Sequence, residues 1–190
     1  MNFLALGDSY TIGEGVAASE RWPEQLAGAL RSRGVDVDPP QIIAQTGWTT
    51  GELSAAIDEA APRGPFDLVT LLIGVNDQYR GLSTGEYRTR FVRLLRRAIG
   101  LAGDDASRVI VISIPDWSVT PFAQLRDRER IAREIDALNE ANREGAVRAA
   151  ARYVDVTGLS RRFPSLLAAD GLHPSAEMYA RWVEAMLLSF

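Results

Sequence analysis

Short apolar runs alternate along this chain with longer segments of helical character, and this alternation constrains the fold more than any other feature. Runs this short, with Val, Ile and Leu at consecutive positions, are typical of strands buried on both faces of a parallel sheet. A strand followed by a helix, five times over, predicts a three-layer α/β/α sandwich around a five-stranded parallel sheet. The runs are Phe3 to Leu6, Ile42 to Ala44, Leu68 to Ile73, Val109 to Ile114 and Tyr153 to Val156.

The segments between the runs contain recognisable helix starts, namely a proline suited to a first turn and two pairs with capping-box spacing. The expected helices run from Pro23 to about Arg33, from the pairs Thr49–Glu52 and Ser83–Glu86, over Ala123 to Arg152 and over Ser175 to Leu188. The 190 residues are enough for one well-buried core and contain no linker or repeat. We therefore expect residues 1–190 to form a single domain.

The charge and residue balance excludes several classes of function. A net charge of −4 argues against a nucleic-acid partner or stable binding to an anionic membrane, because both need a basic face. The chain has no Cys, so disulfides, thiolate zinc sites and Cys nucleophiles are excluded. Met1 leads into the first run without a basic segment or a long apolar stretch, which predicts a cytoplasmic protein unless a signal peptide has been removed.

Polar residues follow each of the apolar runs. They are Ser9, Gly47, the segment from Gly74 to Asp77, Asp116 and, further along, His173. In open α/β sheets the ligand crevice lies outside the carboxyl ends of the strands. We therefore expect these residues, although far apart in sequence, to meet at one edge of the sheet.

The chain has one histidine, His173, and its side chain is the natural candidate for acid–base chemistry near neutral pH. A lone histidine is usually structural, but Asp170 lies three residues upstream and Ser9 follows the first run. These three residues match the needs of nucleophilic catalysis, which are a hydroxyl, a base and a carboxylate that orients the base. The backbone N–H groups of Ser9 and Gly47 and the side-chain amide of Asn76 are candidate donors to an oxyanion.

These blocks resemble the SGNH or GDSL hydrolases, a family named for Ser, Gly, Asn and His in separate parts of the sequence. The matching blocks are Gly7-Asp8-Ser9-Tyr10, Thr46-Gly47-Trp48, Gly74-Val75-Asn76-Asp77 and Asp170-Gly171-Leu172-His173. The resemblance implies a flavodoxin-like fold and hydrolysis of acyl esters or thioesters without a cofactor or metal. It also implies Ser9 as nucleophile, Gly47 and Asn76 as oxyanion donors, and the Asp170–His173 pair. Tyr10 replaces the Leu of the family name, outside the catalytic set.

Several residues near these blocks are candidates for substrate contact. Trp48, Tyr79 and Trp117 would offer apolar surface beside the crevice, although each could equally pack in the core. Asp77 is a further candidate, and Phe122 falls in the same region. Asp8 is expected to support the loop around Ser9 without taking part in the chemistry.

Other functions remain open at this stage. The turn from Gly7 to Gly15 could bind a flavin, but a Walker-type phosphate loop is excluded because the chain has no Lys. A metal-dependent hydrolase would need a site made almost entirely of oxygen ligands, and a non-catalytic binding module would leave the complete set of residues unexplained. An acyltransferase, a thioesterase or a lysophospholipase would use the same residues. We favour a serine hydrolase of small, short-chain acyl esters, with a small-molecule substrate as its partner.

Overall fold

The computed structural model describes residues 1–190 and contains one sheet of five parallel strands in the order β2-β1-β3-β4-β5. The strands are β1 (Phe3–Gly7), β2 (Gln41–Ala44), β3 (Leu68–Leu72), β4 (Val109–Ile112) and β5 (Arg152–Val154). The three central strands are buried along their whole length, whereas β2 and β5 form the partly exposed edges. The predicted three-layer α/β fold with a five-stranded parallel sheet is confirmed.

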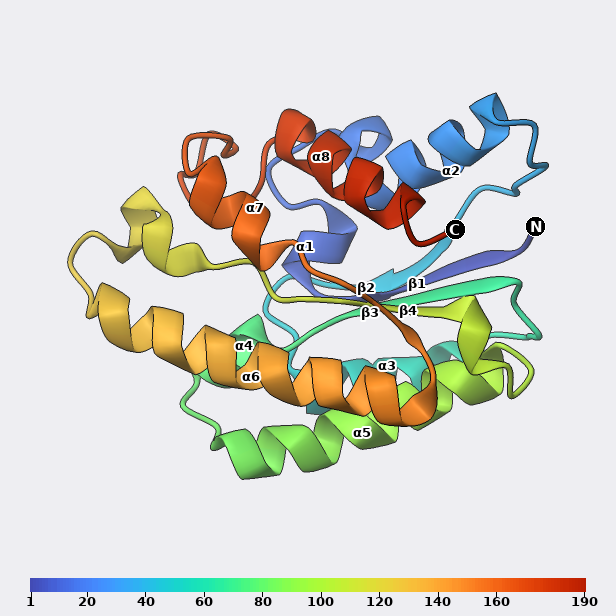
Figure 1. Cartoon of the computed structure of the whole chain (residues 1–190), viewed down its shortest axis with the longest axis horizontal. Helices are drawn as coiled ribbons and strands as arrows, with labels where there is room; N and C mark the ends of the chain where they lie inside the picture. The colour runs from blue at the N-terminus through green and yellow to red at the C-terminus, as the bar shows by residue number, and fades with distance from the viewer.

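Helices cover both faces of the sheet. They are α1 (Ser9–Ile12), α2 (Trp22–Ser32), α3 (Thr50–Ala60), α4 (Val75–Tyr79), α5 (Thr84–Leu101), α6 (Arg128–Ala149), α7 (Thr157–Arg162) and α8 (Ala176–Leu187). Figure 1 shows α2, α7 and α8 on one face and α3, α5 and α6 on the other. A core of 45 buried apolar residues joins the three layers. None of the helices combines the length and the apolar composition needed to cross a membrane.

The predicted helix starts agree with the structure where a capping side chain marks them. Thr49 Oγ1 accepts a hydrogen bond from the Glu52 N–H, and the Glu52 carboxylate accepts one from the Thr49 N–H at 2.7 Å. Ser83 Oγ accepts a hydrogen bond from the Glu86 N–H at 3.3 Å and begins α5. Such reciprocal caps satisfy N–H groups that have no partner inside the helix.

The long helix differs from the prediction at both ends. It was expected over Ala123 to Arg152, but α6 begins at Arg128 because the Asp127 carboxylate caps it through the Arg130 N–H. The residues before it form a separate 3₁₀ turn over Pro121–Ala123. Ala150 adopts a left-handed backbone with φ of 56°, which ends α6 and directs Arg152 into β5. The apolar periodicity alone did not reveal these two stops.

The register of the strands brings the ends of β1, β2 and β3, which precede the predicted site residues, to the same edge of the sheet. Gly7 at the end of β1 is opposite Ala44 of β2 and Leu72 of β3. The turns that follow these three residues therefore leave the sheet side by side, at its carboxyl edge. Ser9 begins α1, and Asn76 lies in α4, which starts three residues after β3 ends. Neither of these two short helices was predicted.

Candidate active site

Ser9 is held in a tight turn between β1 and the short helix α1. The Asp8 carboxylate caps this helix by accepting a hydrogen bond from the Tyr10 N–H at 3.0 Å. Ser9 is the first residue of the helix, so its own N–H has no acceptor inside the helix. The Ser9 residue is only 4% exposed, and it lines a cleft at the carboxyl edge of the sheet. The turn thus presents both the hydroxyl and an unused N–H at the same place.

Asp170 holds His173 through three hydrogen bonds. Its Oδ2 lies 2.6 Å from His173 Nδ1, and its Oδ1 accepts the N–H groups of Leu172 and His173 at 2.9 and 3.0 Å. One carboxylate therefore shapes the loop and orients the imidazole. Partial burial acts to raise the pKa of Asp170, but the bonds from His173 and the two N–H groups outweigh it and lower that pKa. The carboxylate stays ionised and favours a proton on Nδ1, which leaves Nε2 as the basic nitrogen.

Asn76 and Gly47 complete the set of donors. Asn76 Nδ2 donates a hydrogen bond to the Trp48 carbonyl at 2.9 Å, which fixes the amide and leaves its second N–H available. Gly47 has φ of +88° and its N–H makes no hydrogen bond with the backbone. A Cβ at residue 47 would meet no atom within 4 Å. The glycine is therefore required by the left-handed backbone and not by crowding.

A single cleft brings the predicted residues together. It has a volume of about 260 Å³, near the lower end of the sizes seen for small-molecule sites. No hydrogen bond joins Ser9 Oγ to His173 in this structure, and such bonds often tighten only when substrate is present. The lining residues are Ser9, Tyr10, Thr46, Gly47, Val75, Asn76, Tyr79, Trp117, Phe122, Leu172 and His173.

The candidates for substrate contact divide into two groups. Tyr79 and Trp117 line the cleft, as does Phe122. Trp48 does not line it, and contributes instead the carbonyl that holds Asn76. A residue next to a site residue in sequence need not direct its side chain into the same space, as Trp48 beside Gly47 shows.

Asp77, expected as a further candidate for substrate contact, lies apart from the cleft in this structure. Asp77 is 1% exposed and lies outside the cleft, and both of its oxygens accept hydrogen bonds from Thr50. The Thr50 N–H and hydroxyl donate at 2.9 and 2.6 Å. Burial raises the pKa of Asp77, and the two bonds from Thr50 oppose that shift. Asp77 therefore ties α4 to the start of α3 and so fixes the segment that carries Asn76.

Tyr10, which lies outside the predicted catalytic set, lines the cleft. Its ring meets the His173 ring edge-on, with ring centres 5.6 Å apart, and it packs on Trp182 of α8 from the other side. The Tyr10 side chain thus supports the imidazole from behind. Its position directly after Ser9 was no reliable signal, because Trp48, directly after Gly47, does not line the cleft.

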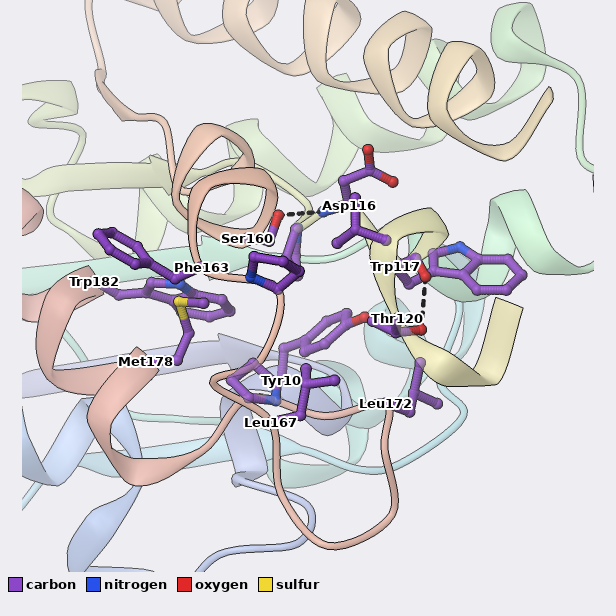
Figure 2. A pocket seen from close by; sticks show the side chains of 14 residues that line it. Tyr10, Asp116, Trp117, Thr120, Ser160, Phe163, Leu167, Leu172, Met178 and Trp182 are labelled. Carbon is purple, nitrogen blue, oxygen red and sulfur yellow. Dashed lines mark hydrogen bonds between the residues drawn. The ribbon is translucent and has the colours of Figure 1, made fainter. Parts of the chain in front are cut away.

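A second, smaller cavity lies behind Tyr10. Figure 2 shows the Tyr10 ring at its centre, between Trp182 and Met178 of α8 and the side chains of Thr120 and Leu172. This cavity has a volume of about 20 Å³, which is room for about one water molecule. Tyr10, Trp117 and Leu172 line both spaces and separate them. The catalytic cleft therefore does not continue into a tunnel at this point.

A metal-binding site requires several ligating side chains that lie close together. No set of three or more His, Asp or Glu side chains is placed to hold an ion.

Comparisons with known proteins agree with this arrangement. The model of the GDSL-like lipase/acylhydrolase family matches residues 5–181. An arylesterase from Vibrio mimicus is 30% identical over 113 residues, which are 58% of this chain and 53% of that protein. The chain thus spans about half the length of this curated relative.

Solved structures share the fold at low sequence identity. The crystal structure of TesA superposes with a TM-score of 0.78 at 19% identity, covering 100% of this chain and 97% of the other. A lipase from a goat rumen metagenome gives 0.79 at 19% identity, over 100% and 97% of the two chains. A variant of an acetyl-xylooligosaccharide esterase from Geobacillus gives 0.77 at 19%, over 99% and 93%. Because the family model matches most of its length, the chain belongs to the GDSL-like lipase/acylhydrolase family.

Proposed function

We propose that this chain hydrolyses small acyl esters through an acyl-enzyme on Ser9. The observation that carries the proposal is the shared cleft, into which Ser9, Gly47, Asn76 and His173 come from four different turns. Their common position supports a single reaction centre. Asp170, the remaining predicted residue, holds the imidazole from outside the cleft at 2.6 Å.

In the first half of the reaction Ser9 Oγ attacks the ester carbonyl carbon. His173 Nε2 accepts the Ser9 proton, since Nδ1 is directed at the Asp170 carboxylate. The carbonyl oxygen becomes an oxyanion that receives hydrogen bonds from the N–H groups of Ser9 and Gly47 and from Asn76 Nδ2. These donors are already in place, so the transition state gains them with little reorganisation.

In the second half the bond to the alcohol breaks and His173 delivers its proton to the leaving oxygen. Water then attacks the acyl carbon while Nε2 accepts its proton, and this proton passes to Ser9 Oγ as the bond between Oγ and the acyl carbon breaks, which releases the acid and restores the Ser9 hydroxyl. The Asp170 carboxylate stays ionised throughout and stabilises the imidazolium, in keeping with its lowered pKa.

The shape of the cleft supports short acyl groups. The volume of about 260 Å³ is shared between the acyl and alcohol parts of the substrate, and the cavity behind Tyr10, at about 20 Å³, has no room for an alkyl chain. Tyr79, Trp117 and Phe122 form an aromatic wall that suits a flat leaving group. The arylesterase and the acetyl-xylooligosaccharide esterase among the similar proteins are in line with such substrates.

A series of nitrophenyl esters tests the proposal. We expect kcat/KM to be highest for acetyl to butyryl esters and to fall for longer acyl groups. Ser9→Ala and His173→Ala should each lower kcat by about a thousandfold or more. The double variant should lose little more than either single variant, because the two side chains act as one unit. Full hydrolysis by Ser9→Ala would overturn the proposed nucleophile, and a rate that rises steadily with chain length would overturn the short-chain preference.

A further inference from the structure

An arginine lies on the aromatic wall at the rim of the cleft. The guanidinium carbon of Arg126 is 5.1 Å from the centres of the Tyr79 and Phe122 rings and 5.7 Å from that of Trp117. Its Nη2 also donates a hydrogen bond to Tyr79 Oη at 3.0 Å. Arg126 itself is exposed, and it lines a shallow hollow that adjoins the cleft and shares Tyr79 and Trp117 with it. One cation is therefore held in place at the end of the catalytic cleft.

No carboxylate pairs with this arginine. The Asp127 carboxylate caps α6 through the Arg130 N–H, and it forms no ion pair with Arg126. Glu134, the other acid of the hollow, accepts hydrogen bonds from Arg130 Nε at 2.6 Å and Gln78 Nε2 at 2.7 Å. Of its five N–H donors, Arg126 gives one to Tyr79. Its remaining donors make no hydrogen bond or ion pair within the protein, and the residue is exposed.

We propose that Arg126 and the aromatic wall form a subsite for an ester whose leaving group carries an anion, such as a carboxylate, on a flat or aromatic body. This inference rests on the proposed function in one respect, which is that the cleft is the site where the substrate binds. The flat body would lie against Tyr79 and Phe122, which are 50% and 43% exposed beside the buried Trp117, and the anion would reach the guanidinium at their edge. A guanidinium matches a carboxylate in a planar, bidentate geometry.

Because it is held by three rings, Arg126 is better suited than an ordinary surface arginine to distinguish an anionic ester from a neutral one. A free arginine side chain loses conformational entropy when it pairs with a ligand, whereas Arg126 is already ordered by stacking and by its bond to Tyr79. The chain carries a net charge of −4, so its overall field does not attract anions. A preference for an anionic ester would therefore have to come from this local charge.

A matched pair of substrates measures that preference. Para-acetoxybenzoate and para-acetoxybenzamide have the same acetyl group and nearly the same leaving group, and differ in charge at the far end of the ring. We expect the ratio of their kcat/KM values, anionic over neutral, to fall about fivefold in Arg126→Gln and much less in Arg126→Lys. Raising the salt concentration should reduce the ratio in the wild-type protein, because the guanidinium is exposed.

Arg133→Gln serves as the control for a general charge effect. Arg133 is also an exposed arginine of α6, but it pairs with Glu129 at 3.8 Å and lines neither the cleft nor the hollow. We expect this variant to keep the wild-type ratio. An equal fall in Arg133→Gln, or an unchanged ratio in Arg126→Gln, would overturn the subsite.

A binding measurement separates failure of the subsite from failure of the proposed chemistry. Ser9→Ala protein is titrated with the two product phenols, para-hydroxybenzoate and para-hydroxybenzamide, with no catalysis involved. We expect the benzoate to bind about fivefold more tightly, and the preference to disappear when Arg126→Gln is added. Equal binding of the two phenols would overturn the subsite even if Ser9 proves to be the nucleophile.

Discussion

Single residues in the cleft are held by partners that do not line it. The Trp48 carbonyl holds the Asn76 amide, and the Asp170 carboxylate holds the His173 ring. Ser9 and His173 could be predicted because each belongs to a short block whose residue types have a chemical reason to occur together. Arg126 could not, because its segment resembled part of a long helix and nothing in the sequence places it over three rings from other turns.

The Asn76 amide provides the first prediction. Asn76→Ala should lower kcat for an acetyl ester by on the order of a hundredfold, because one of three donors to the oxyanion is lost. Its KM should change much less, since this donor acts mainly in the transition state. Steady-state kinetics on nitrophenyl acetate measures both values.

Asn2→Ala is the matched control for that measurement. Asn2 precedes β1 at the amino edge of the sheet, opposite the cleft, and its side chain makes no hydrogen bond. We expect wild-type kinetics from it. A loss of less than threefold in Asn76→Ala would remove Asn76 from the oxyanion site.

At the scale of secondary structure elements, helix starts marked by a pair of residues with capping-box spacing could be predicted. The short helices α1 and α4, which carry Ser9 and Asn76, could not. Thr49 with Glu52 and Ser83 with Glu86 both mark the start of a helix. Helix α1 has four residues, too few for any apolar period, and its cap Asp8 lies within the predicted nucleophile block. It forms because β1 packs on one side and the Asp8 side chain accepts a hydrogen bond from the Tyr10 N–H.

Asp8 gives this short helix a pH-dependent stability. Its side chain is fully buried, Oδ2 has no hydrogen-bond partner, and burial raises the pKa of the carboxyl to about 8. Between its ordinary pKa and this raised value, the native state holds one more proton than the unfolded state. The free energy of unfolding contributed by Asp8 therefore falls as the pH rises through that range.

Asp8→Asn should remove this dependence while keeping the cap, because asparagine accepts the same hydrogen bond. We expect the variant to gain stability relative to the wild-type protein as the pH rises from about 5 to about 8, by on the order of 1 kcal/mol per pH unit. Urea unfolding at several pH values measures the difference. Asp105→Asn is the control, since Asp105 caps a 3₁₀ turn in the same way but 44% of its side chain is exposed. Parallel pH profiles for Asp8→Asn and the wild-type protein would show that Asp8 is ionised when buried.

At the scale of the whole molecule, the parallel sheet is what brings the site together. The apolar runs predicted five strands and hence a common carboxyl edge, and the register of β1 with β2 and β3 produces that edge. Strand ends were predicted less well, because β4 ends at Ile112 and β5 at Val154, each two residues before the end of its apolar run. The separation of Trp48 and Asp77 from the cleft depends on loop geometry, which apolar periodicity does not encode.

Reaction with a fluorophosphonate tests most directly whether these turns form one serine hydrolase site. The reagent forms a covalent adduct with an activated serine, and mass spectrometry of the digested protein locates it. We predict one adduct per chain, on Ser9, with ester hydrolysis lost in proportion to labelling. An adduct on another residue, or full hydrolysis by protein labelled at Ser9, would contradict the assignment of Ser9 as the nucleophile.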